Sequence, residues 1–198
     1  MNFRTFSTVA LLTLSCVFSA AAETLPADHP SAAVVKKYLQ AVVQQDWTGA
    51  ANMLLPASLE RRKQQMIGAV KSSATMTEEA SKLSMLGLKD ISDLDKLSAQ
   101  EAYVADRKAV HERMKITEDI IKKKTDTLQI NILGLVPEDN ARIVHAVVRT
   151  KQDTLEANIE ELLLISLAQD KADSKKWLIV PDMQAPITTP LKTAEVKK

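Results

Sequence analysis

Cysteine, glycine and aromatic residues are scarce in this chain of 198 residues. Cys16 is the single cysteine, and it lies within the N-terminal apolar segment. The four glycines, Gly49, Gly68, Gly87 and Gly134, are scattered along the chain. None of them forms part of a glycine-rich loop, so the motifs that cradle phosphates are absent.

The N-terminal segment, residues 1–22, is typical of a cleavable secretory signal. Arg4 gives a short positively charged start, and residues 5–18 are free of charge and largely apolar. The segment ends in small residues, with Ala20 and Ala22 as the pair that signal peptidase requires. We therefore expect a periplasmic or secreted protein that begins near Glu23.

Two alternatives remain open for this segment. A membrane anchor needs about 20 apolar residues, and this stretch is shorter. A lipoprotein would use Cys16, but Thr13 stands where a lipobox has leucine. With a cleaved signal, no transmembrane segment is expected in the remaining chain.

Removal of the signal leaves a chain without thiols, so neither a disulfide nor a thiolate metal site can form. Arg4 is the only charged residue that is lost, so 25 acidic residues face an equal number of basic ones. A neutral chain does not favour nucleic acid or an anionic membrane surface as a partner. Four aromatic residues remain: Tyr38, Trp47, Tyr103 and Trp177.

The first half of the remaining chain carries helical signals. A first helix is expected to start at Asp28 or Ser31, with apolar residues at helical spacing from Val34 to Val43. Asp46 can cap a second, shorter helix that stops before Pro56. A third helix is expected from Ser58 to about Lys71. Two capping boxes then predict helices over residues 76–85 and from Ser98 to about Met114: Thr75-Met76-Thr77-Glu78 and Ser98-Ala99-Gln100-Glu101.

The second half carries strand signals. From Thr125 onward the apolar period changes to two, and a turn is expected at residues 137–140. Residues 141–150 and 176–180 are expected to be strands, while residues 159–168 suit either a helix or a central strand. We predict a strand there, because its neighbours on both sides are strands at hairpin distance.

The predicted fold class is therefore α+β, with a helical N-terminal half packed on a curved antiparallel sheet of about four strands. Residues 23–185 are expected to form one domain. Residues 186–198 are expected to form a disordered tail, because they lack apolar periodicity.

Three stretches resemble exported members of the nuclear transport factor 2-like superfamily. Residues 32–47 are similar to their first helix, which ends in an acidic-aromatic step, here Asp46-Trp47. Residues 139–149 are similar to their hairpin and long curved strand, and residues 174–180 to their closing strand. The resemblance implies a strongly bent sheet around helices with a conical cavity. This fold hosts isomerases, dehydratases, binders and interaction domains, so it does not specify a function.

His145 is the candidate catalytic residue, because enzymes of this fold often place an acid or base in the cavity. It lies in a strand, on the same face as Ile143 and Val147, and Glu161 on the neighbouring strand is a candidate partner. The alternative is a structural histidine within the sheet.

Trp47, Tyr103 and Glu161 are candidate binding residues, although Trp47 and Tyr103 also suit a core. The histidines are dispersed, so we expect no metal site, and no motif indicates a cofactor. The leading hypothesis is a non-catalytic domain that binds a protein or an apolar small molecule. A small isomerase, lyase or hydrolase that uses His145 is the second hypothesis, and a structural homodimer is the third.

The signal assignment predicts the effect of a charge in the apolar stretch. Leu12→Arg should block export and leave the full-length precursor in the cytoplasm, because a signal needs an uninterrupted apolar core. Mass spectrometry of the exported wild-type protein should find Glu23 at its start. A diacylglyceryl group on Cys16 would contradict the prediction of a soluble exported protein.

Overall fold

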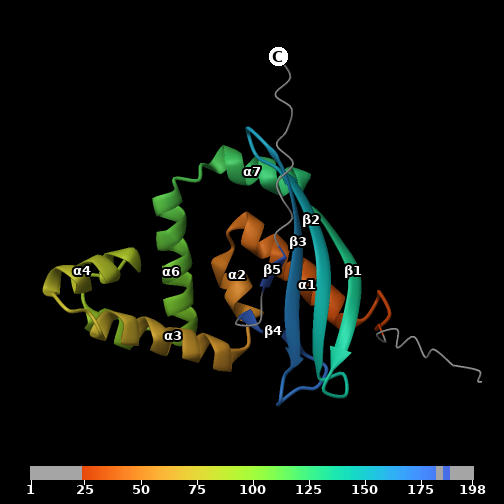
Figure 1. The fold of residues 1–198 in the computed structure, drawn as a ribbon, viewed down its shortest axis with the longest axis horizontal. Helices are drawn as coiled ribbons and strands as arrows, with labels where there is room; N and C mark the ends of the chain where they lie inside the picture. Colours follow the sequence, from red (N-terminus) through yellow and green to blue (C-terminus); the bar gives the residue numbers. More distant parts are fainter. Residues whose placement is uncertain (1–23, 182–184, 188–198) are drawn as a thin grey trace, which may run out of the picture.

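The structure, a computed structural model, describes residues 24–181 and 185–187. Helices form the first part of the described chain and an antiparallel sheet forms the second (Figure 1). The predicted α+β class is therefore confirmed. The expected signal segment, residues 1–22, lies outside the described residues.

Seven helices precede the sheet within the described chain. They are α1 (Pro30–Gln44), α2 (Trp47–Asn52), α3 (Pro56–Lys71), α4 (Met76–Met85), α5 (Ile91–Lys96), α6 (Ala99–Met114) and α7 (Glu118–Thr127). Both predicted capping residues work as expected: Thr75 Oγ1 accepts a hydrogen bond from Glu78 N, and Ser98 Oγ accepts one from Glu101 N. The Glu101 carboxylate in turn accepts from Ser98 N, which lowers the pKa of this carboxyl.

Helix α7 corrects the prediction that strand structure begins at Thr125. The helix continues to Thr127, and the first strand begins at Gln129. Thr117 caps this helix with a hydrogen bond from Ile120 N to its hydroxyl. Helix α5 was also not predicted, and α3 begins at Pro56 rather than Ser58, because proline suits the first turn of a helix.

The sheet runs in the order β1-β2-β3-β4, with every neighbouring pair antiparallel. Its strands are β1 (Gln129–Glu138), β2 (Ile143–Asp153), β3 (Asn158–Gln169) and β4 (Trp177–Ile179). A short strand, β5 (Ala185–Ile187), also pairs with β3 and overlaps the first two residues of the expected tail. Residues 159–168 are thus part of a central strand, as predicted, whereas β1 extends to Glu138 and moves the turn to residues 139–142.

One face of the sheet carries the main core. Val144, Ala146 and Val148 of β2 are fully buried on this face, since alternate residues of a strand point the same way. They pack in one cluster with Val35 and Leu39 of α1. Burial of each large apolar side chain contributes about 1.5–3 kcal/mol, so this face holds α1 on the sheet.

A second, smaller core joins the helices that stand away from the sheet. Ile67 of α3, Leu94 of α5 and Ala102 of α6 form it. Helices α1 and α2 lie between α6 and the sheet, and α7 crosses from α6 back to the strands (Figure 1).

The core position of Trp177 predicts a large loss of stability on truncation. Its side chain is 5% exposed, so Trp177→Ala should lower the free energy of unfolding by about 3–5 kcal/mol. Denaturant unfolding measures this change. Leu155→Ala is the control, because Leu155 is 64% exposed and its removal should have little effect. A small effect of Trp177→Ala would contradict the packing of β4 in the core.

Candidate functional site

A pocket of about 330 Å³ lies between α1, α6, α7 and the strands β2 and β3. Most of its helical lining is apolar, with Leu39, Val42 and Val43 from α1 and Val110 from α6. The remaining lining residues are Gln45, Trp47, Arg107, His111, Met114, Ile116, Ile121, Lys124, Leu128, Thr150, Gln152, Glu161 and Leu163. A pocket of this size and composition is suited to a small ligand with an extended apolar part.

The wall formed by α1, α2 and α6 is fixed by local hydrogen bonds. Gln45 ends α1 in a left-handed conformation, and its Nε2 donates to His111 Nε2 on α6 (2.6 Å). Asp46 caps α2 by accepting from Gly49 N at 2.8 Å, which places Trp47 at the start of that helix. A Cβ on Gly49 would lie 2.0 Å from Asp46 Oδ2, so this cap requires glycine. The indole of Trp47 is half-buried and lines the pocket.

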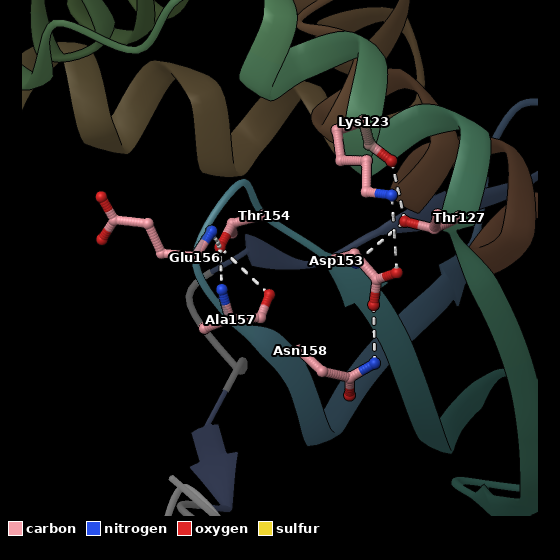
Figure 2. A network of polar contacts seen from close by, with 7 residues as sticks. All are labelled: Lys123, Thr127, Asp153, Thr154, Glu156, Ala157 and Asn158. Atoms are coloured by element: carbon pink, nitrogen blue, oxygen red, sulfur yellow. Dashed lines mark hydrogen bonds and ion pairs between the residues drawn. The ribbon is translucent and has the colours of Figure 1, made fainter. Parts of the chain in front are cut away.

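The opposite wall depends on how α7 is attached to the β2–β3 hairpin. Helix α7 has no fully buried side chain, so apolar burial alone does not set its position. Figure 2 shows the polar contacts at its C-terminal end: Asp153 N donates to Thr127 Oγ1 at 2.8 Å, and Thr127 Oγ1 donates to Lys123 O at 2.7 Å. Asp153 Oδ1 also accepts from Asn158 Nδ2 (2.6 Å) and Asp153 Oδ2 lies 4.0 Å from Lys123 Nζ.

Two of the three candidate binding residues, Trp47 and Glu161, meet in this pocket. Tyr103 does not line it. Its ring is 6% exposed and lies beneath two cations, with Arg62 Cζ 5.9 Å and Arg107 Cζ 5.6 Å from the ring centroid. Burial raises the pKa of the Tyr103 hydroxyl. Tyr103 is therefore a core residue, which was the alternative interpretation of its role.

His145 lies on the other face of the sheet from the pocket. Val144 and Ala146, its neighbours along β2, are buried against the helices, and alternate strand residues point to opposite faces. The prediction that Glu161 is the partner of His145 is wrong. Glu161 pairs with Thr150 in the sheet register and lines the pocket on the opposite face. The actual partners of His145 are Ser166, whose Oγ lies 2.8 Å from Nδ1, and Glu138, whose Oε2 lies 2.5 Å from Nε2.

Ser166, His145 and Glu138 thus form a serine–histidine–carboxylate sequence of hydrogen bonds. A nucleophile must be reachable by its substrate, and Ser166 is only 1% exposed. His145 is also absent from the lining of the pocket, where a substrate would have room. This arrangement suits a polar link between three strands, and catalysis by His145 stays the second hypothesis.

The face that carries His145 also bears half-buried apolar side chains. Within the described residues, no helix covers Val136, Val147 and Leu164 on this side of the sheet. Self-association through this face remains the third hypothesis. The described part of the chain holds no cluster of three or more metal-ligating side chains and no helix long and apolar enough to span a membrane.

Gln152 and Thr150 are site residues that the sequence analysis missed. Both are polar, yet they lie at buried positions of β2 and face the helices, at 8% and 4% exposure. The β2 register gives the signal in retrospect, since Gln152 continues the alternation of Val144, Ala146 and Val148. In the sequence alone, a polar residue near the end of a strand is usually solvent-exposed.

Comparisons with known proteins give no relative for this chain. No family model, no curated protein and no solved structure matches it. The fold that the structure supports is α+β, with helices followed by an antiparallel sheet. The resemblance to the nuclear transport factor 2-like superfamily therefore has no support beyond this general architecture.

The Thr127 contacts predict a test of how α7 is held. Thr127→Val keeps the shape of the side chain but leaves Asp153 N without its acceptor, so the free energy of unfolding should fall by about 1 kcal/mol. Amide hydrogen exchange in α7 should accelerate. Lys122→Ala is the matched control on the same helix, because its ion pair with Asp126 is exposed. Equal acceleration in both variants would contradict a specific role for Thr127.

Proposed function

We propose that this protein is a non-catalytic binding domain that holds an apolar small molecule in the pocket between α1, α6, α7 and the sheet. The observation that carries the proposal is the pocket itself, at about 330 Å³ with a mainly apolar helical lining. Ligand pockets in proteins start at about 300 Å³ and combine apolar walls with a few polar groups.

The construction of the walls supports binding rather than a packing defect. The lining of this pocket combines apolar side chains from α1, α6 and α7 with polar side chains from β2 and β3, which is the composition of a ligand site. Here the Gln45–His111 hydrogen bond joins the end of α1 to α6, and the Thr127–Asp153 hydrogen bond joins α7 to β2. The elements that bound the pocket are thus linked in pairs by hydrogen bonds.

The absence of a placed catalytic group in the lining favours binding over catalysis. His111 lines the pocket, but its Nε2 is already hydrogen-bonded to Gln45. Glu161 is exposed at the pocket, and no described basic side chain forms an ion pair with it. General acid–base catalysis needs groups with matched positions around a substrate, and this lining offers isolated ones.

The proposal predicts the behaviour of a pocket-filling variant. Pyrene, which carries no hydrogen-bonding group, should bind with saturation, and the vibronic ratio of its emission should report an apolar environment. Val110→Phe enlarges a half-buried side chain in the pocket lining and should weaken pyrene binding at least about tenfold, which corresponds to about 1.4 kcal/mol.

Val147→Phe is the matched control, because it makes the same change at a half-buried valine on the other face of the sheet. It should leave pyrene binding unchanged, and His145→Gln should do the same. Absence of saturable binding to the wild-type protein would reject the proposal. Equal weakening by Val147→Phe would place the probe elsewhere.

A further inference from the structure

We infer that the ligand of this pocket is an apolar molecule that carries a hydrogen-bond donor, a hydroxyl in the simplest case, and that this donor binds Gln152. The inference rests on the proposed function, since it names the ligand class for the same pocket. It is carried by a buried polar atom in the lining that the described residues leave unpaired.

Gln152 lies near the C-terminal end of β2, and its side chain lines the pocket at 8% exposure. Its Oε1 is buried and has no hydrogen-bond partner among the described residues. An amide oxygen kept from water without a partner is unfavourable, and native structures leave few such atoms. Because Gln152 lines the pocket, a rotation of its side chain would bring this oxygen to the pocket surface, where a donor group on a ligand would satisfy it.

The neighbours of Gln152 give this end of the pocket further acceptors. Thr150, two residues earlier on the same face of β2, is 4% exposed and brings its hydroxyl to the lining. Glu161 pairs with Thr150 across the β2–β3 ladder and brings a carboxylate. A hydroxyl or amine would find acceptors here, whereas a carboxylate ligand would meet like charge at Glu161.

Two cationic side chains also line the pocket, and neither of them replaces a ligand donor at Gln152. Lys124 is half-buried, and a long lysine side chain can extend its ammonium to water. Arg107 is bound to Asp106 Oδ2 at 3.0 Å and stacks on Tyr103. Its Nε is buried without a partner, which suits a hydroxyl ligand because a hydroxyl also accepts hydrogen bonds.

The apolar part of the ligand would lie against the helices. Val42, Val43, Val110 and Ile121 line that side, while the hydrogen-bonding groups Thr150, Gln152 and Glu161 come from the strands. The helical side also carries Gln45, Arg107, His111 and Lys124, and the sheet side carries Leu163, so the two walls differ in proportion: apolar side chains dominate on the helices, and the acceptors Thr150, Gln152 and Glu161 lie on the strands. This division orients an amphiphilic molecule with its donor toward the sheet.

The test compares 1-decanol with its isomer methyl nonyl ether, which has the same atoms but no donor. Displacement of pyrene measures both affinities. The wild-type protein should bind the alcohol about tenfold or more tightly than the ether, because only the alcohol satisfies Gln152 Oε1. In Gln152→Leu this preference should disappear, while the thermal midpoint should not fall, because an unpaired buried oxygen has been removed.

The outcomes separate this inference from the proposed function. Equal displacement of pyrene by the alcohol and the ether in the wild-type protein would overturn the inference. It would mean that Gln152 Oε1 is hydrogen-bonded to water, or that the amide oxygen and nitrogen occupy each other's positions. The proposal of an apolar binding pocket would remain intact. A preference for the alcohol that survives in Gln152→Leu would also overturn the assignment to Gln152. Failure of pyrene itself to bind would instead reject the proposed function.

Decylamine tests whether a charged donor is recognised in the same way as the hydroxyl. Binding of the amine that weakens in Gln152→Leu would support the inference, because the ammonium is also a donor. Amine binding that weakens in Glu161→Gln but not in Gln152→Leu would overturn it, since the charge of Glu161 would then be the recognition element.

Discussion

The attachment of α7 to the β2–β3 hairpin is the constraint on which the pocket depends. Helix α7 buries no side chain completely, so apolar packing leaves its position weakly determined. The Thr127 hydroxyl joins the two elements, because it accepts from Asp153 N and donates to Lys123 O. Helix α7 also contacts α1 and β2, so loss of the Thr127 contact would loosen this wall of the pocket rather than remove it.

The same attachment explains why the pocket stays open beside a well-packed core. The apolar face of β2 up to Val148 is covered by α1, and there the side chains are fully buried. Beyond Val148 the strand continues through Thr150 to Gln152, and α7 contacts this C-terminal end of β2. Polar side chains, Thr150 and Gln152, continue this face under a helix that buries no side chain completely, and the pocket lies between them.

Much of the fold follows from local sequence signals. The two capping boxes predict the starts of α4 and α6, because the bonds involved lie within four residues and need no tertiary partner. The composition of residues 159–168 suited either a helix or a strand. The strands expected on both sides led to the prediction of a strand, which is confirmed. Helix α7 was missed because its lysine-rich sequence lacks a broad apolar stripe and runs directly into the alternation of β1.

The site was less predictable, because it depends on sheet register and on which face the helices cover. Trp47 and Glu161 were selected from the sequence and do line the pocket. His145 was selected for its chemistry, but the register places it across the sheet beside Ser166 and Glu138. Gln152 could be recognised only when the buried face of β2 was known, since its sequence neighbours Lys151 and Asp153 resemble a solvated strand end.

The most direct measurement of the central claim is a set of intermolecular nuclear Overhauser effects between 1-decanol and the methyl groups of the protein. We predict contacts from the alkyl chain to Val110 on α6 and Ile121 on α7, which both line the pocket. Contacts to Val147 and Leu164, on the other face of the sheet, would contradict the claim, as would a spectrum without contacts to either face.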